Sequence, residues 1–213
     1  MSTYRALSAL LSYPDEEMIA ALPEISGALA PLPGAQQRLA PLLAWLMENS
    51  LVTVQESYVA TFDRSRALSL YLFEHVHGES RERGEALLDL LREYQRHGFE
   101  PDDREGSARE MPDYLPLFLE FLGQLPPDGA GVLLADAVHV IALLHERLQE
   151  RGSPYAPLLA LLVELSPEKP QPMTDAPARD MDALLETVGP GADGTEPLLR
   201  PDNSGVQVIR FHR

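Results

Sequence analysis

The sequence contains no cysteine among its 213 residues. Disulfides, thiolate metal sites, iron–sulfur clusters and cysteine nucleophiles are therefore excluded. The absence fits a reducing compartment, and the N-terminus lacks the basic and apolar regions of a secretory signal, so we expect a cytoplasmic protein. No uninterrupted apolar run reaches about 18 residues, which predicts that the chain does not insert into a membrane.

Positive charge is scarce as well. Lys and Arg total 17 against 33 Asp and Glu, which gives a net charge of −16. A protein that binds duplex nucleic acid needs a basic surface, so no nucleic-acid partner is expected. The balance favours a neutral or basic partner, although acidity that only maintains solubility would also explain it.

Recognisable catalytic machinery is missing from residues 56–122, the most distinctive stretch of the chain. This stretch has no Gly-rich loop to cradle phosphate and no nucleophile beside a base. His75 and His77 form an H-x-H pair, but a metal site needs three or four ligands and no second pair lies nearby. Glu110 and Asp113 could do acid–base work, although capping and partner binding are favoured. We therefore predict no enzyme activity, no metal and no cofactor.

Helix-forming residues are abundant. Hydrophobic residues make up 45% of the chain, and Leu and Ala dominate over Val and Ile, which favours helices over sheets. Apolar residues recur at helical spacing along residues 1–165. Residues 166–213 contain seven Pro and four Gly. The sequence thus predicts an all-α, single-domain bundle over 1–165 and a mostly disordered tail over 166–213.

Several helix boundaries can be expected from Pro and Gly. Pro41 predicts that the helix around it begins there, and Pro112 predicts a helix that runs through Leu125. Residues 63–77 read as a packed linker that ends in a helical turn. Gly98 is expected to stop the helix before it in a left-handed conformation.

Aromatic residues at helical spacing are ordinarily part of the core, but a subset here could line a groove. The helix after Pro112 is apolar nearly all round, so either it is central to the bundle or part of it faces a groove. Phe118 and Phe121 are neighbours on one face of this helix. We predict that at least one of these two rings lines a peptide groove.

Three stretches resemble a known family. They are LSALLSYPDE at 7–16, YVATFDRSRALSLYLFEHVHGESRERGEALLDLL at 58–91, and EMPDYLPLFLEFL at 110–122. Together they resemble the NarJ-type chaperones that assemble respiratory nitrate reductase, within the TorD/DmsD group of redox-enzyme maturation proteins. The third stretch corresponds to the acidic E-x-x-D-His motif of that group, with Tyr114 where His is common.

The resemblance implies a function. It implies an all-α chaperone that binds the N-terminal segment of the nitrate reductase catalytic (alpha) subunit, allows molybdenum cofactor insertion and delays docking to the membrane subunit. Motif residues and candidate aromatics together give the predicted client-peptide site: Tyr58, Phe62, Tyr71, Phe73, His75, Glu110, Asp113, Tyr114, Phe118 and Phe121.

Two alternatives remain open at this point. One is a sibling chaperone that serves a different molybdenum enzyme. The other is a small-molecule-binding helical enzyme that uses Glu110, Asp113 and His75. Capture of an amphipathic, basic peptide in an apolar groove with acidic edges fits the composition best, because apolar anchors supply affinity and complementary charge supplies orientation.

Overall fold

The structure of the chain is a computed structural model that describes residues 1–78, 82–100 and 110–173. Within these ranges every regular element is a helix, and the only β pairing is one isolated bridge between Tyr71 and Tyr114. The predicted all-α fold is confirmed. The tail prediction falls largely outside the described residues, which end at Met173.

Four helices make up the N-terminal part of the chain, and side-chain caps begin three of them. Ser2, Asp15 and Ser50 each accept a hydrogen bond from the backbone N–H three residues further on, which satisfies a donor that has no partner within the helix. The helices are α1 (Thr3–Leu11), α2 (Glu16–Ala28), α3 (Ala35–Glu48) and α4 (Leu51–Tyr58).

Pro41 lies inside α3 instead of beginning it, so this boundary prediction was wrong. The helix starts at Ala35, directly after Gly34, whose φ of 71° suits glycine. Proline cannot donate to the carbonyl four residues earlier. The buried stripe of Leu39, Leu42 and Leu46 extends on both sides of the proline, so tertiary burial stabilises the helix despite the missing hydrogen bond.

The middle of the chain changes direction several times. A π-helical turn, η1 (Val59–Asp63), continues α4, and a 3₁₀ turn follows, η2 (Arg66–Leu68). Helix α5 (Leu72–His77) ends at Gly78, as expected for the linker, and α6 (Glu82–Arg96) precedes Gly98 at φ 71°. The predicted left-handed stop at Gly98 is confirmed.

Three helices complete the described part: α7 (Leu115–Leu122), α8 (Pro127–Glu150) and α9 (Ala156–Leu165). Helix α7 is shorter than predicted at both ends. Pro116, rather than Pro112, occupies its first turn. The residues just before α7 pair with the segment before α5 through the Tyr71–Tyr114 bridge, which holds them in an extended conformation.

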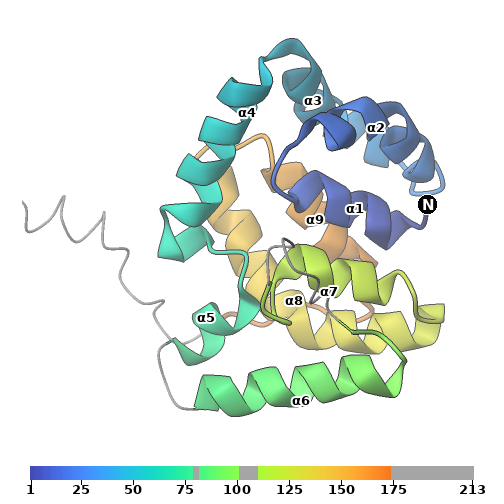
Figure 1. Cartoon of the computed structure of the whole chain (residues 1–213), viewed down its shortest axis with the longest axis vertical. Coiled ribbons are helices and arrows are strands. Elements are labelled where there is room, and N and C mark those ends of the chain that lie inside the picture. Colours follow the sequence, from blue (N-terminus) through green and yellow to red (C-terminus); the bar gives the residue numbers. More distant parts are fainter. Residues whose placement is uncertain (79–81, 101–109, 174–213) are drawn as a thin grey trace, which may run out of the picture. The chain divides into compact units, whose positions relative to one another are not determined.

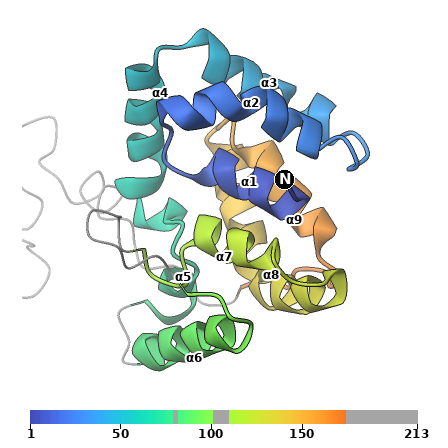
Figure 2. The ribbon, with the colours of Figure 1, turned by 45° about the vertical axis from the view of Figure 1, so that its right-hand side comes forward.

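The helices pack around one hydrophobic core in the described residues. Helices α8 and α9 form a hairpin, α7 packs on both α1 and α8, and α6 packs on α5. In Figures 1 and 2 the central helices α7 and α8 lie between α2 and α3 on one side and α6 on the other. Phe118 and Phe121 both belong to this core.

Helix α8 is long and apolar enough to cross a membrane, which distinguishes it from the other helices in the described ranges. Its apolar residues have another explanation. Leu134, Val138, Ile141, Leu144 and Leu148 form a stripe that is completely buried against neighbouring helices. A core helix passes the same composition test, so this one helix is weak evidence of a membrane span.

Candidate functional site

Backbone pairing brings together two stretches that are distant in the sequence. The N–H of Leu72 donates to the carbonyl of Asp113 at 3.0 Å, and the N–H of Leu115 donates to the carbonyl of Leu70 at 2.8 Å. The bridge sets the rings of Tyr71 and Tyr114 side by side, with centroids 5.3 Å apart. This pairing builds one wall of a pocket from the beginnings of α5 and α7.

The pocket has a volume of about 660 Å³ and combines aromatic rings with carboxylates. We call it the tyrosine pocket. Its residues come from the α1–α2 connection, the end of α4, η1, residues 65–71, α5 and the segment before α7. They are Tyr13, Tyr58, Phe62, Asp63, Ser65, Arg66, Ser69, Leu70, Tyr71, Glu74, Glu110 and Tyr114.

Three tyrosine hydroxyls in the pocket are oriented by hydrogen bonds. The O–H of Tyr58 donates to the carbonyl of Leu11 at 2.8 Å, so its single hydrogen is used there. The Tyr114 hydroxyl, 3.0 Å from that of Tyr58, is therefore the donor between the two. Burial raises the pKa of Tyr114 to about 12, which keeps this donor protonated at neutral pH. The Tyr71 hydroxyl donates to Glu110 at 2.6 Å.

The carboxylates of the pocket differ in whether a positively charged side chain pairs with them. Glu74 pairs with Arg83 at 3.2 Å. Glu110 and Asp63 form no ion pair with any residue in the described part of the chain. Burial, followed by the nearby negative charge of Glu110, raises the pKa of Asp63. Arg66 also lines the pocket, but the carboxylates of Asp63, Glu74 and Glu110 outnumber its guanidinium. The lining is therefore net negative, which favours a cationic ligand.

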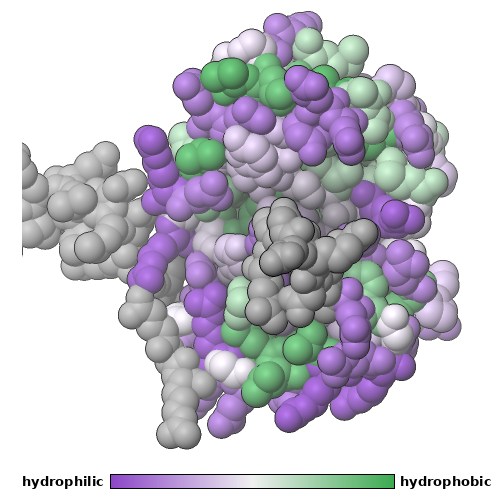
Figure 3. Space-filling view, viewed as in Figure 1, coloured by the Kyte–Doolittle hydropathy of each residue, from purple (hydrophilic) through white to green (hydrophobic). Residues whose placement is uncertain are grey.

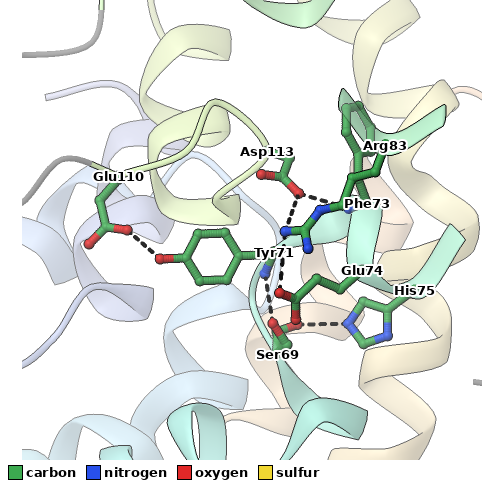
Figure 4. A network of polar contacts seen from close by, with 8 residues as sticks. All are labelled: Ser69, Tyr71, Phe73, Glu74, His75, Arg83, Glu110 and Asp113. Carbon is green, nitrogen blue, oxygen red and sulfur yellow. Dashed lines mark hydrogen bonds and ion pairs between the residues drawn. The ribbon is translucent and has the colours of Figure 1, made fainter. Parts of the chain in front are cut away.

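Asp113 is completely buried and does not line the tyrosine pocket. One carboxylate oxygen accepts the N–H of Phe73 at 3.0 Å and lies 3.9 Å from Arg83 (Figure 4). Burial raises the pKa of Asp113. The hydrogen bond from Phe73 and the charge of Arg83 lower it, but by less than burial raises it. Asp113 therefore ties the segment before α7 to α5 and α6, a role beside the pocket.

His75 and Phe73 also lie outside the pocket lining. The His75 ring is buried, and Nε2 lies 2.8 Å from the carbonyl of Ser69 (Figure 4). A carbonyl only accepts, so Nε2 carries the hydrogen. Phe73 is half-buried, with its ring against His77. No group of three His, Asp or Glu residues in the described ranges could hold a metal ion.

Phe118 and Phe121 correct the expectation of a groove along α7. Phe118 is 4% exposed and Phe121 is 0% exposed, so neither ring faces a groove. Phe121 packs on Tyr94 with ring centroids 4.3 Å apart, and on Phe99 at 5.5 Å. The helix is apolar all round because it is central: α1 covers one side, α8 another, and the rings of Tyr94 and Phe99 a third.

The structure thus brings together five of the ten predicted site residues. Tyr58, Phe62, Tyr71, Glu110 and Tyr114 line the pocket. The main residues that sequence reasoning missed are Tyr13 and the two acids Asp63 and Glu74. Asp63 directly follows Phe62 in the stretch that carries the family resemblance, which was the available signal. Tyr13 lies in the first stretch of the resemblance, so the same signal was available for it. Its ring reaches the pocket by packing against the ring of Tyr58, with centroids 5.6 Å apart.

A second apolar surface lies on α6. Only Tyr94 of this helix is buried, whereas Leu87, Leu90 and Leu91 are partly exposed and Leu88 is 54% exposed. On the face drawn in Figure 3, a green area lies over α6 and is bordered by hydrophilic residues. This surface is separate from the tyrosine pocket, to which α6 contributes no lining residue.

The described part of the chain is thus an all-α bundle with an aromatic, acidic pocket. The model of the nitrate reductase delta subunit family matches residues 30–160. The chain belongs to this family, and the resemblance to the NarJ-type chaperones is confirmed.

Individual relatives support the same placement. The nitrate reductase molybdenum cofactor assembly chaperone NarJ of Escherichia coli (strain K12) is 43% identical over 165 residues, which cover 75% of this chain and 67% of NarJ. NarW of the same strain, provisionally named a chaperone of that kind, is 39% identical over 170 residues, which cover 78% of this chain and 68% of NarW. These relatives are named as chaperones and not as enzymes, in agreement with the prediction that the chain is not an enzyme.

A solved structure supports the fold. It comes from Archaeoglobus fulgidus and is provisionally named a redox enzyme maturation protein. It superposes with a TM-score of 0.52 at 20% sequence identity, over 75% of this chain and 88% of the other. At this identity the likeness concerns the arrangement of helices alone.

Proposed function

We propose that the protein is an assembly chaperone that binds the N-terminal segment of the catalytic subunit of a respiratory nitrate reductase. The names of the relatives support a chaperone role in molybdenum cofactor assembly. The observation that carries the peptide-binding part is the tyrosine pocket, whose aromatic lining holds three carboxylates, Asp63, Glu74 and Glu110, and one guanidinium, Arg66, so that it is net negative.

The pocket suits one end of an amphipathic, basic peptide. Tyr13, Tyr71 and Tyr114 offer apolar faces and π-faces, on which an aliphatic or aromatic anchor and a cation can both pack. The rings of Tyr58 and Phe62 are almost completely buried and support these faces from behind. Asp63 and Glu110 then orient the basic side chain of the client. Binding in this way uses contacts of the kind that anchor peptide helices in grooves.

Sequestering the segment gives the chaperone its two further roles. While the pocket holds the N-terminal segment, the catalytic subunit cannot use that segment to dock on its membrane partner. The apoenzyme then remains accessible for insertion of the molybdenum cofactor. The chaperone works outside the membrane, and its own chain supplies binding and not chemistry.

The enzyme alternative finds no support in the geometry. Its three proposed groups point in different directions: Glu110 toward Tyr71, Asp113 toward Arg83, and His75 toward Ser69 (Figure 4). Only Glu110 reaches the pocket. A general acid and base would have to reach the same substrate, and these residues share no space.

Binding of a synthetic peptide with the N-terminal sequence of the catalytic subunit, measured by calorimetry, tests the proposal. We expect the wild-type chain to bind, and the double variant Asp63→Asn, Glu110→Gln to bind at least about tenfold more weakly, since it loses both carboxylates. The control is Glu48→Gln, Glu56→Gln, which changes the net charge equally at exposed positions outside the pocket.

Two outcomes would contradict it. If the wild-type chain does not bind the peptide, the proposed client is wrong. If both double variants weaken binding equally, net charge and not the pocket attracts the peptide. Tighter binding of the corresponding segment from another molybdenum enzyme would identify a sibling chaperone.

A further inference from the structure

Residues 65–71, which we call the wall segment, contribute five of the residues that line the tyrosine pocket. The segment has little regular structure of its own. It contains one 3₁₀ turn, in which the N–H of Leu68 donates to Ser65 at 2.9 Å, and the single bridge at Tyr71. The bond from the Leu115 N–H to the Leu70 carbonyl and the burial of Leu68 and Leu70 hold part of the segment. Two of its other carbonyls depend on side chains.

Two carbonyls of the wall segment accept hydrogen bonds from side chains of other elements. The Arg147 guanidinium, from α8, donates Nη1 to the carbonyl of Ala67 at 2.6 Å. His75, from α5, donates Nε2 to the carbonyl of Ser69 at 2.8 Å. One turn after Arg147, Arg151 donates to the hydroxyl of Ser65 at 3.2 Å. The wall segment is thus held on α8 and α5.

Among these hydrogen bonds, the one from Arg147 has a charged donor that is partly buried. Its guanidinium is half-buried, and burial lowers its pKa, so it has left part of its hydration to make this contact. A hydrogen bond with a charged donor in such surroundings is stronger than one between neutral groups. Burial lowers the pKa of His75, and the positive charge of Arg147 lowers it further, so the two side chains that hold the wall segment also interact with each other.

We propose that Arg147 is a positioning residue for peptide binding. It does not line the tyrosine pocket. It holds the Ala67 carbonyl, and through it the backbone that carries Ser69, Leu70 and Tyr71 into the pocket. Client affinity is therefore set partly on α8, 80 residues away in the sequence from the wall it supports. This inference rests on the proposed function for its binding readout.

Hydrogen exchange and peptide affinity of the full chain test the inference together. The variant Arg147→Met keeps the aliphatic stem and loses the donors. We expect the amides of Leu68, Ser69 and Leu72 to exchange about tenfold faster and the peptide of the previous section to bind about tenfold more weakly. Core amides of α9 should not change, because the loosening is local.

Two further variants separate positioning from general destabilisation. Arg147→Lys should restore part of both readouts, since an ammonium group can donate to the same carbonyl. Arg92→Met, which removes an exposed arginine of α6 paired with Asp89, should alter neither. If Arg147→Met does not fold, Arg147→Gln serves in its place with smaller expected changes in the same direction.

Hydrogen exchange in the wall segment and peptide affinity can contradict the inference separately. Unchanged exchange in the wall segment overturns the inference whatever happens to the peptide. Faster exchange with unchanged affinity also overturns it, since the wall would then be held without effect on binding. If the wild-type chain does not bind the peptide, the proposed client fails, and the exchange measurement alone decides whether Arg147 holds the wall.

Discussion

Phe118 and Phe121 show how an individual residue is assigned to the core or to a surface. Both are separated from solvent, Phe121 completely. The rings of Tyr94, Phe99 and His97 surround Phe121 with centroid distances between 4.3 and 5.8 Å. Such close packing means that truncation leaves a cavity which neighbouring side chains fill only in part.

We predict that Phe121→Ala lowers the free energy of unfolding by about 3–5 kcal/mol, and that Phe118→Ala has a similar effect. Urea denaturation followed by circular dichroism measures both. Phe73→Ala is the matched control, because this ring is only half-buried and should cost clearly less. A small loss for Phe121→Ala would mean that this ring does not pack as the structure shows.

His75 predicts a pH dependence of stability. Its pKa is lowered from 6.5, by burial first and also by the charge of Arg147, with Ser69 and Glu74 acting in the opposite direction. The folded state therefore binds fewer protons than the unfolded state below about pH 6.5, so stability decreases as the pH falls from about 6.5 toward the folded pKa.

The variant His75→Gln should remove this contribution. Its amide can still donate to the carbonyl of Ser69 but has no proton to bind. Thermal melts between about pH 7 and 5 should therefore show a shallower decline for the variant than for the wild type. His97→Gln, at an exposed position on the C-terminal side of α6, is the comparison. Equal slopes for His75→Gln and the wild type would exclude His75 as the source.

At the scale of elements, close approach between helices decides where small residues are needed. Gly123 ends α7 where it meets the start of α1. A Cβ atom there would lie 2.7 Å from the Ser2 hydroxyl oxygen and 2.8 Å from Cγ of Arg5. Since Ser2 also caps α1, an added methyl group would disturb both the packing and the cap.

We predict that Gly123→Ala destabilises the protein by about 2 kcal/mol, because the two helices must separate. The control is Gly84→Ala inside α6, where a Cβ would meet nothing within 4 Å. That variant should be more stable by about 0.5–1 kcal/mol, since alanine favours the helix. Urea denaturation distinguishes the two, and the same sign of effect at both positions would contradict the packing argument.

At the scale of the whole molecule, the excess of negative charge would extend the attraction of the pocket for the proposed basic client. A net charge of −16 attracts a basic peptide before contact, whereas the tyrosine pocket acts at short range. Long-range attraction is screened over about 10 Å at 0.1 M salt, but contacts inside a partly buried pocket are screened much less.

Raising the salt concentration should therefore slow association of the peptide more than it speeds dissociation. Stopped-flow measurements between about 0.05 and 0.5 M NaCl would show this, because rates fall as the Debye length shortens. A neutral peptide of the same length is the control and should associate at a nearly constant rate. A dissociation rate that carries most of the salt effect would place the electrostatics in the bound complex.

The chain that ends at Leu165 is predicted to fold without the residues after it. It would lose the hydrogen bond between Gln171 and His139 and the packing of Met173 on the core, so we expect a slightly lower melting temperature. Helical circular dichroism and a single cooperative transition should remain. A broad, non-cooperative melt would show that the C-terminal residues complete the core.

The sequence alone determined the helices, most of their buried faces and the family of the chain. Helical periodicity is a local property, so the stripes of α3, α7 and α8 could be recognised without tertiary information. The absence of cysteine excluded whole classes of chemistry. Boundaries at Pro41 and Pro112 were wrong because burial and strand-like pairing, both tertiary effects, outweighed the local preference of proline.

Only the tertiary structure decided which residues form the site. Periodicity tells which side of a helix faces inward, but not whether the space there is filled or open, since helices distant in sequence determine that. The rings of Tyr94 and Phe99 fill the space around Phe121, whereas Tyr71 and Tyr114 meet at an open pocket. Arg147 supports that pocket from α8, a contact that no local pattern could reveal because it depends on how α8 packs beneath the wall segment.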